Sequence, residues 1–313
     1  MPAFTASAPG KIILFGEHAV VYHRPALAVP VTQVRAQAIV IPDLRGAPGR
    51  QRLLAPDMNT DADLSELPDD HPLVATTRNL FESLEITRPP AYTLKITSTI
   101  PIAAGLGSGA AITVATLRSL SAFLGRRLTD EAVNKLTFEV EKLYHGTPSG
   151  IDNTVITYAQ PVYFRRDQPI ERFHVAEPFT IVIADTGIRS PTSVAVGDVR
   201  KGWQADPERF EASFDAITNI VEQAREAIET GKLEQLGPLM TENHIHLQEI
   251  GVSSPALDAL VNAAIDAGAF GAKLSGGGRG GNMIALTSID HAETVAEALK
   301  TAGASHTLTT TIT

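Results

Sequence analysis

The chain has 313 residues, of which 43% are hydrophobic and 19% charged, and it contains no cysteine. The lack of cysteine excludes thiol catalysis, thiolate metal sites and a disulfide framework, and it fits a reducing cytoplasm. The formal net charge of −9 would repel nucleic acid, so any phosphate site must be local and built from a few cations and backbone amides.

No basic segment leads into a long apolar run near the start of the sequence, so we expect neither a signal peptide nor a transmembrane helix. We therefore expect a cytoplasmic protein with no membrane or nucleic-acid partner. Single hydrophobic cores stop growing near roughly 250 to 300 residues, so this length favours two domains.

The first half of the chain alternates between strand and helix patterns. The expected elements are short strands between residues 4 and 41 broken at Pro9-Gly10, Gly16 and Pro30, a mobile polar excursion over 43–71, a helix over 72–85, a strand over 92–100, a helix from the stretch PIAAGLGSGAA (101–111) to Gly125, a helix from the cap Thr129 to Gly146, and a hairpin over 153–166. We expect the first domain to cover residues 1–177.

The second half predicts a separate α/β sandwich over residues 178–313. Its expected elements are strands over 179–185, 270–275, 282–288 and 305–312, and helices over 207–231, 232–250, 255–268 and 291–302. His244 and His246 stand two apart on one of these helices and so face different directions, which argues against a metal pair.

The stretch over 101–111 places a glycine-rich turn between a strand and a helix. Backbone N–H groups at a helix start attract anions, and glycine lets a phosphate approach closely. The P-loop pattern GxxxxGK[ST] is absent, however. Spacing alone therefore leaves a phosphate site and a plain turn as equal alternatives.

Three other segments carry polar side chains at element ends. Lys11 precedes a strand, Glu17 and His18 follow it, and Glu141 and Asp152 lie on and after a predicted helix. In isolation each has an ordinary explanation, such as a surface lysine, a structural histidine or a turn aspartate. A fourth segment, the glycine run over 276–281, would by itself indicate a hairpin loop.

Taken together and in order, these motifs resemble those of the GHMP kinase superfamily. The motifs are PGKIILFGEHAVVY near the N-terminus, PIAAGLGSGAA in the middle and KLSGGGRGG near the C-terminus, and the resemblance runs from about residue 6 to residue 286. Within the superfamily the segments GEHAVVY and HGTPSGIDN are similar to those of the mevalonate kinases, whereas galactokinases carry a GEHTDY-like version.

The resemblance implies an α+β fold of two domains, an N-terminal domain like ribosomal protein S5 domain 2 and a C-terminal ferredoxin-like α/β sandwich. It implies that ATP and mevalonate bind in the cleft between the domains, and that the γ-phosphate of ATP passes to the C5 hydroxyl of (R)-mevalonate with the help of Mg²⁺. A homodimer is expected from the family alone.

The resemblance also assigns roles to matching residues. Asp152 matches the catalytic aspartate and Lys11 its partner, while Glu141 matches the carboxylate that holds Mg²⁺. The remaining implied sites are the phosphate loop Ala104, Gly105, Leu106, Gly107, Ser108, Gly109 and Ala110, the phosphate neighbour Thr192, and the substrate-binding residues Glu17, His18, Asp152 and Arg189.

One position departs from the family pattern. The family motif usually reads GLGSSAA and its second serine is a Mg²⁺ ligand, whereas this chain has Gly109 there. Either Ser108 replaces that hydroxyl or a water does so.

Rival interpretations stay open at this point. The nearest rivals are a sibling kinase for phosphomevalonate, a kinase for another hydroxyl of mevalonate, and a decarboxylase that begins with phosphorylation. A phosphorylated substrate would need a further cluster of cations near Glu17 and His18, where the sequence offers only Arg24 and Arg189. Galactokinase or homoserine kinase activity is less favoured. A regulator that binds nucleotide without catalysis would fit Gly109 but not the presence of the full catalytic set.

Overall fold

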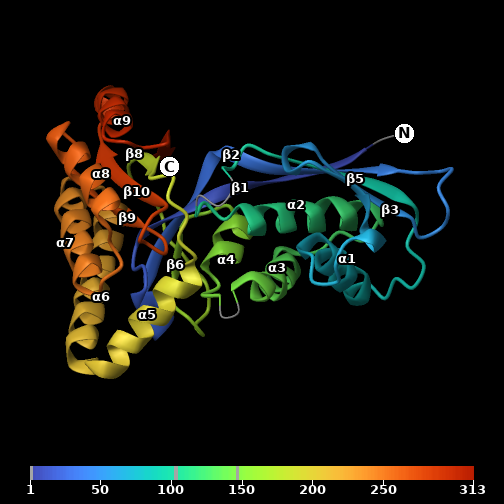
Figure 1. Ribbon diagram of the computed structural model, residues 1–313, viewed down its shortest axis with the longest axis horizontal. Helices are drawn as coiled ribbons and strands as arrows, with labels where there is room; N and C mark the ends of the chain where they lie inside the picture. Colours follow the sequence, from blue (N-terminus) through green and yellow to red (C-terminus); the bar gives the residue numbers. More distant parts are fainter. Residues whose placement is uncertain (1–2, 102–104, 146–147) are drawn as a thin grey trace. The chain divides into compact units, whose positions relative to one another are not determined.

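The computed structural model describes residues 3–101, 105–145 and 148–313. The described residues form two compact units (Figure 1). The N-terminal unit contains residues 3–10, 32–101 and the described part of 107–159, and the C-terminal unit contains residues 11–31, 105–106 and 160–313. The domain boundary expected after residue 177 remains a prediction.

The sheet of the N-terminal unit includes the second part of a long strand. This strand, β2 (Ala26–Pro42), pairs antiparallel with β5 (Tyr92–Ser98). Strand β3 (Gln51–Ala55) runs parallel to β5, and β4 (Thr60–Asp63) pairs antiparallel with β3. The excursion expected over 43–71 is therefore wrong in part, because its short apolar run Leu53-Leu54-Ala55 completes the sheet.

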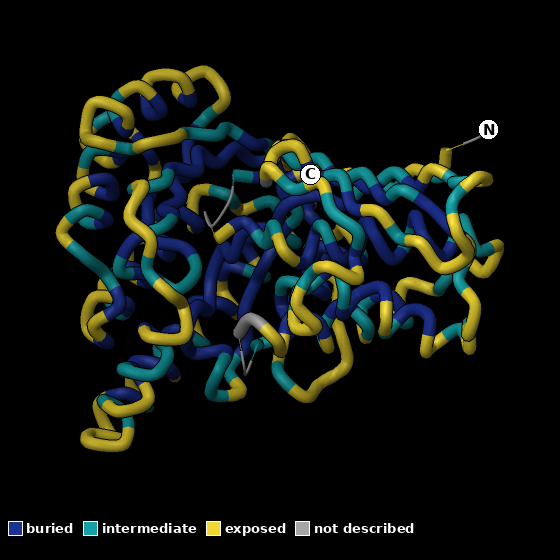
Figure 2. The backbone as a smooth tube through the Cα atoms, turned by 45° about the vertical axis from the view of Figure 1, so that its right-hand side comes forward, coloured by how far each residue is buried: buried dark blue, intermediate teal, exposed yellow. Residues whose placement is uncertain are grey.

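Four helices cover one face of this sheet (Figure 1). They are α1 (Pro72–Ser83), α2 (Ser108–Phe123), α3 (Asp130–His145) and α4 (Ile151–Tyr158). Along β2, buried Val34, Ala36 and Ala38 alternate with exposed Arg35 and Gln37, as expected for a sheet with one covered face. Figure 2 shows the same contrast, with dark buried strands and helices whose outer turns are exposed.

The hairpin expected over 153–166 is wrong in its first half. The β-branched run over 151–158 forms α4, which begins after Gly150 at φ 95° and ends at Ala159 at φ 50°. Asn153 donates a hydrogen bond from Nδ2 to Oδ1 of Asn134 on α3, at 2.5 Å. Burial among helices thus outweighs the strand propensity of the sequence.

Two prolines expected to break strands lie inside them. Strand β1 (Phe4–Phe15) continues through Pro9, and β2 continues through Pro30. Pro30 falls between the stretch of β2 that pairs with β6 (Val162–Phe164) and the stretch that pairs with β5, so its missing N–H removes no bond from either ladder.

The C-terminal unit contains a four-stranded antiparallel sheet. Its strands, in spatial order, are β11 (His306–Ile312), β8 (Phe179–Asp185), β10 (Asn282–Thr287) and β9 (Gly271–Ser275). These strands confirm the sequence prediction. Every residue of β9 and β10 is buried, so both of their faces are covered.

Helices of the C-terminal unit pack on this sheet and on one another. They are α5 (Thr192–Ala205), α6 (Pro207–Thr230), α7 (Leu236–Glu249), α8 (Pro255–Asp266) and α9 (Ala292–Thr301). The remaining short elements of the described chain are β7 (Glu171–Arg172) and the 3₁₀ turns Ala19–Tyr22, Pro56–Met58, Leu64–Glu66, Leu233–Gln235 and Ile289–His291.

Helix starts follow local chemistry where the sequence predicted them. Thr129 Oγ1 accepts a hydrogen bond from the N–H of Ala132, and Ser254 caps α8 ahead of Pro255. Helix α5 was not expected, because Ala195 and Val199 are its only buried hydrophobic side chains and it carries two glycines. No helix within the described residues is long and apolar enough to cross a membrane.

Close packing of α7 on β9 predicts a sharp contrast between two helical glycines. A methyl group on Gly237 would lie 2.1 Å from the carbonyl oxygen of Phe270, whereas one on Gly197 of α5 would meet nothing within 4 Å. Gly237→Ala should lower the free energy of unfolding by roughly 1–3 kcal/mol through overpacking. Gly197→Ala, the control, should raise it by roughly 0.5–1 kcal/mol through helix propensity. Equal effects in urea denaturation would contradict this packing.

Candidate active site

The start of α2 presents backbone donors that the helix itself does not use. Its N-cap is Gly107 at φ 73°, which has no side chain to cap the helix, and the first turn contains no acidic residue. The first helical hydrogen bond runs from the N–H of Ala111 to the carbonyl of Gly107, at 2.9 Å. The N–H groups of residues 108–110 therefore have no partner within the helix, and such a helix start attracts anions.

A buried carboxylate lies beside this helix start. Glu141 on α3 is 4% exposed, so it does not lie on the solvent-facing side of that helix. A Cβ atom on Gly109 would be 3.6 Å from Glu141 Oε1. Asp152, the second residue of α4, is half-buried, and α4 packs against both α2 and α3. The N-terminal unit thus gathers Ser108, Gly109, Glu141 and Asp152 on three adjoining helices.

In the C-terminal unit, a tight turn follows β1. Gly16 has φ 96°, and a Cβ there would lie 2.4 Å from the carbonyl oxygen of Pro25, so glycine is required. The next two residues, Glu17 and His18, are 1% and 5% exposed. His18 has φ 60°, a conformation that a residue with a Cβ adopts where its surroundings impose it. Lys11, in β1, is also buried.

Three side-chain contacts join the end of β1 and this turn to strand β9 and the glycine run that follows. Ser275 Oγ donates to the carbonyl of Ile13 at 2.8 Å, and His18 Nε2 bonds to the carbonyl of Gly277 at 3.0 Å. Lys273 Nζ donates to Glu17 Oε1 in an ion pair with both side chains buried. The first and third sequence motifs are therefore locked together within one unit.

Burial determines the protonation of His18. It lowers the pKa of His18 to about 4, the charge of Arg279 adds to this, and the bond to Gly277 opposes it. The ring is therefore neutral at pH 7. A carbonyl accepts only from N–H, so Nε2 carries the proton and Nδ1 is left as an acceptor.

Burial also acts on the ion pair. It raises the pKa of Glu17, while the charge and hydrogen bond of Lys273 and the charge of Lys11 oppose that rise. It lowers the pKa of Lys273, against the attraction of Glu17. Each member of the pair therefore depends on the other to remain charged.

The glycine run lies against the start of α5. A Cβ on Gly277 would lie 2.8 Å from Thr192 Oγ1, so the threonine hydroxyl faces this loop. Arg279 sits in the run at φ 59° and donates from its guanidinium to Asp198 Oδ2 at 2.6 Å. The side chain of Arg279 is thereby directed to α5 and leaves the loop to act through its backbone.

Two arginines considered at the sequence level differ in surroundings. Arg24 binds Glu211 and Asp215 on α6, which engages its charge. Arg189 is exposed.

Of the phosphate-loop residues, Gly105 and Leu106 belong to the C-terminal unit, Gly107 to Ala110 belong to the N-terminal unit, and Ala104 lies outside the described residues.

Sequence reasoning missed Lys273 and Ser275 as members of this group. The signal was present, because a lysine in the middle of a strand buried on both faces needs a counter-charge.

The two histidines of α7 bond different carboxylates, His244 to Asp258 and His246 to Glu249. Across the residues the structure describes, no three His, Asp or Glu side chains form a group that could hold a metal ion.

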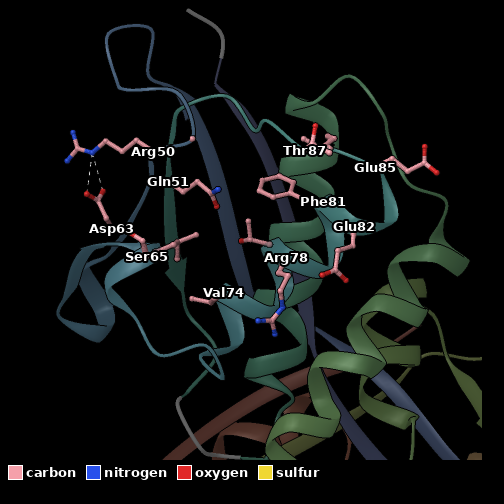
Figure 3. Close-up of a pocket in the computed structure, with 14 residues that line it drawn as sticks. Arg50, Gln51, Asp63, Ser65, Val74, Arg78, Phe81, Glu82, Glu85 and Thr87 are labelled. Atoms are coloured by element: carbon pink, nitrogen blue, oxygen red, sulfur yellow. Dashed lines mark hydrogen bonds and ion pairs between the residues drawn. The ribbon is translucent and has the colours of Figure 1, made fainter.

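A cavity of about 510 Å³ lies elsewhere in the N-terminal unit (Figure 3). Phe81 and Val74 form apolar parts of its lining, and Arg50 at its edge pairs with Asp63. None of the motif residues lines it. It is therefore separate from the candidate site.

Comparison with known proteins gives matches along almost the whole chain. The families described as GHMP kinases N terminal domain and GHMP kinases C terminal match residues 73–160 and 224–305. The mevalonate kinase of Thermococcus sibiricus is 38% identical over 320 residues, which cover 95% of this chain and 93% of that protein. The crystal structure of L. major mevalonate kinase in complex with R-mevalonate matches with a TM-score of 0.83 and 32% identity, covering 100% of this chain and 96% of the other. The Methanococcus jannaschii mevalonate kinase matches with a TM-score of 0.84 and 25% identity over 99% and 98% of the two chains.

The buried, neutral state of His18 can be tested directly. Its imidazole should titrate near pH 4 in NMR spectra of the folded protein, with the resonance assigned by its loss in His18→Gln. Since the pKa in the folded state lies below the ordinary 6.5, His18 contributes stability above pH 6.5 that is lost as the pH falls through about 4. A midpoint near 6.5 would contradict the burial of this ring.

Proposed function

The chain belongs to the mevalonate kinase family of the GHMP kinases, and on that basis we propose that it transfers the γ-phosphate of ATP to the C5 hydroxyl of (R)-mevalonate, giving 5-phosphomevalonate and ADP. The observation that carries this proposal is the buried carboxylate of Glu141 beside the uncapped start of α2, inside a match to mevalonate kinases that spans 95% of the chain.

Family membership confirms the expected fold class. The chain is an α+β protein with the N- and C-terminal domains of the GHMP kinases, and its two sheets with their covering helices agree with this. The expected N-terminal domain like ribosomal protein S5 domain 2 and the ferredoxin-like C-terminal domain are the folds that this family implies.

Asp152 is the proposed proton acceptor. An alcohol is a weak nucleophile at neutral pH. A carboxylate within hydrogen-bond reach can accept the proton of the C5 hydroxyl as its oxygen attacks the γ-phosphate. Lys11 is proposed as its partner, because an ammonium group would balance the negative charge of the carboxylate. The half-buried position of Asp152 at the start of α4 and the burial of Lys11 support these roles.

Phosphate binding is assigned to backbone donors. The proposed donors are the N–H groups of residues 108–110 and those of Gly276, Gly277, Gly278 and Gly280, and the Thr192 hydroxyl faces this glycine run. The N–H groups of Arg279 and Gly281 are engaged by the carbonyls of Val252 and Ile188. Gly105, Leu106 and Gly107 complete the proposed phosphate loop, together with Ala104. Most of the rate enhancement in phosphoryl transfer comes from such positioning and charge stabilisation.

The residues around α2 fit a magnesium ion. Mg²⁺ binds through one or two protein oxygens and otherwise through phosphate oxygens and water, and a buried carboxylate beside a phosphate-binding helix start supplies that protein ligand. Glu141 would hold the ion, with Ser108 as the proposed hydroxyl ligand. When bound, the ion neutralises charge on the transferring phosphate.

The mevalonate end is assigned to the turn after β1. Glu17 and His18 are proposed to bind hydroxyl groups of the substrate, and Arg189 its carboxylate. The two acceptors present there, Glu17 Oε2 and His18 Nδ1, suit hydroxyl donors better than anions. A phosphorylated substrate is disfavoured because Arg24 is already held by Glu211 and Asp215.

We also propose a cytoplasmic location and a homodimer. The absence of cysteine supports the first proposal, and family resemblance alone supports the second.

The reaction is tested by ADP release from Mg-ATP with (R)-mevalonate, phosphomevalonate, galactose or homoserine. We expect turnover with mevalonate alone, and a fall of roughly 10²- to 10⁴-fold in kcat for Asp152→Asn, which keeps the shape but accepts no proton. Turnover with phosphomevalonate instead would assign the chain to a sibling reaction. Nucleotide binding without turnover on any of them would indicate a regulator.

The departure at Gly109 predicts a dependence on Ser108. Ser108→Ala should raise the KM for Mg-ATP by about tenfold, because a hydroxyl ligand is lost. Adding Gly109→Ser to that variant should restore the KM, since there is room for a side chain beside Glu141. Adding Gly109→Ala in its place is the matched control and should restore nothing. Unchanged kinetics in Ser108→Ala would show that no serine hydroxyl is needed.

A further inference from the structure

Lys273 is a charged side chain that cannot reach solvent. It is 0% exposed and lies in the middle of β9, where every neighbour along the strand is also buried. A lysine in such a place costs free energy unless its charge is compensated and its protons are hydrogen-bonded. Its Nζ meets this demand through Glu17 Oε1 and through the carbonyl of Leu274, at 2.7 Å.

The partner carboxylate is only half used by this contact. Lys273 holds Oε1 of Glu17, whereas no hydrogen-bond donor among the described residues reaches the buried Oε2. A buried carboxylate oxygen without a donor is costly, and in native sites such atoms point to a ligand. The atom that binds it must be a donor, such as a hydroxyl, because an anionic group would add repulsion.

Helix α7 holds the backbone of the residue next to the lysine. The N–H of Leu274 donates to His244 Nδ1 at 3.3 Å, and His244 Nε2 bonds to Asp258 Oδ1 at 3.0 Å. Burial lowers the pKa of His244 against the opposing effect of Asp258. A neutral ring fits this pattern, with Nδ1 as acceptor and Nε2–H as donor, and it adds no positive charge next to Lys273.

We infer that Lys273 is a positioning residue for the substrate: it fixes Oε1 of Glu17 so that Oε2 accepts a hydrogen bond from a hydroxyl of mevalonate. Lys273 itself is assigned no contact with the substrate, because its Nζ is engaged by Glu17 Oε1 and by the carbonyl of Leu274. The inference rests on the proposed function. It adds Lys273, from the third sequence motif, to the residues of the first motif that are proposed to recognise the substrate.

The charges around Glu17 set the pH dependence of this pair. Lys273 and Lys11 both lower the pKa of Glu17 against burial, and His18 beside it is neutral. Removing the lysine charge therefore raises the pKa of Glu17 further above its ordinary 4.5. A carboxyl whose pKa is raised by folding loses its contribution to stability as the pH rises above the unfolded value.

The first measurement uses thermal unfolding without substrate. The stability lost in Lys273→Met should grow as the pH rises above 4.5, the ordinary pKa of Glu17, and it should grow much less when Glu17→Gln is also present. A loss that is independent of pH and additive with Glu17→Gln would mean that Lys273 only fills space, and would overturn the inference.

The second measurement separates positioning from general damage. In Lys273→Met the KM for mevalonate should rise by about tenfold or more while the KM for ATP stays within about twofold. The Glu17→Gln/Lys273→Met double variant should be no worse than the poorer single variant, because the two residues act as one unit. Equal increases in both KM values, or no increase for mevalonate, would refute the positioning role.

The lack of cysteine allows a matched rescue. Lys273→Cys, alkylated with 2-bromoethylamine in the unfolded state and refolded, gains a side chain of lysine length ending in an ammonium group. Alkylation with 1-bromopropane gives the same length ending in a methyl group. We expect the KM for mevalonate to recover with the first reagent only; equal recovery with both would assign Lys273 to packing.

Failure of the proposed function is recognised separately. If the wild-type chain turns over none of its candidate substrates, the function and the role toward mevalonate fail together, while the pH-dependent unfolding still decides whether the ion pair exists as inferred.

Discussion

The C-terminal unit is organised around a buried pair of opposite charges. Lys273 lies in β9, a strand buried along its whole length, and its need for a counter-charge is met by the turn after β1. Next to Glu17, His18 has a positive φ and its ring bonds the carbonyl of Gly277 in the glycine run. A stability requirement therefore shapes the surface on which we propose that mevalonate binds.

The N-terminal unit uses the complementary arrangement. There the start of α2 presents backbone donors that the helix itself does not use, and the buried carboxylate of Glu141 lies beside them. Donors and a carboxylate side by side suit a ligand that carries both negative oxygens and a cation, as a magnesium-bound triphosphate does. Gly109 leaves space between the helix start and Glu141. Ser108 supplies the one serine hydroxyl among residues 108–110.

Sequence patterns predicted most helices and the strands of the second sheet, because those segments have clear periodicity and caps such as Thr129 and Ser254. They failed where tertiary contacts outweigh local preference. The run over 151–158 is β-branched yet forms α4 among other helices, and β3 was hidden in a polar segment because it needs only a few apolar residues beside β5.

The candidate site was identified by resemblance more than by chemistry. Single residues such as Glu17 and Asp152 looked ordinary, and only the order of the motifs pointed to a kinase. The contacts of Lys273 could not be foreseen, since they join residues 256 positions apart. The one available signal was a lysine inside an apolar strand. It indicates that a counter-charge is needed, but it does not indicate which residue supplies it.

The most direct test of this account is phosphorus-31 NMR of the product formed from Mg-ATP and (R)-mevalonate. We expect a phosphate monoester whose phosphorus couples to the two protons on C5, formed in step with ADP. A phosphate ester on another oxygen, a diphosphate, or no new phosphorus signal would contradict the proposed reaction.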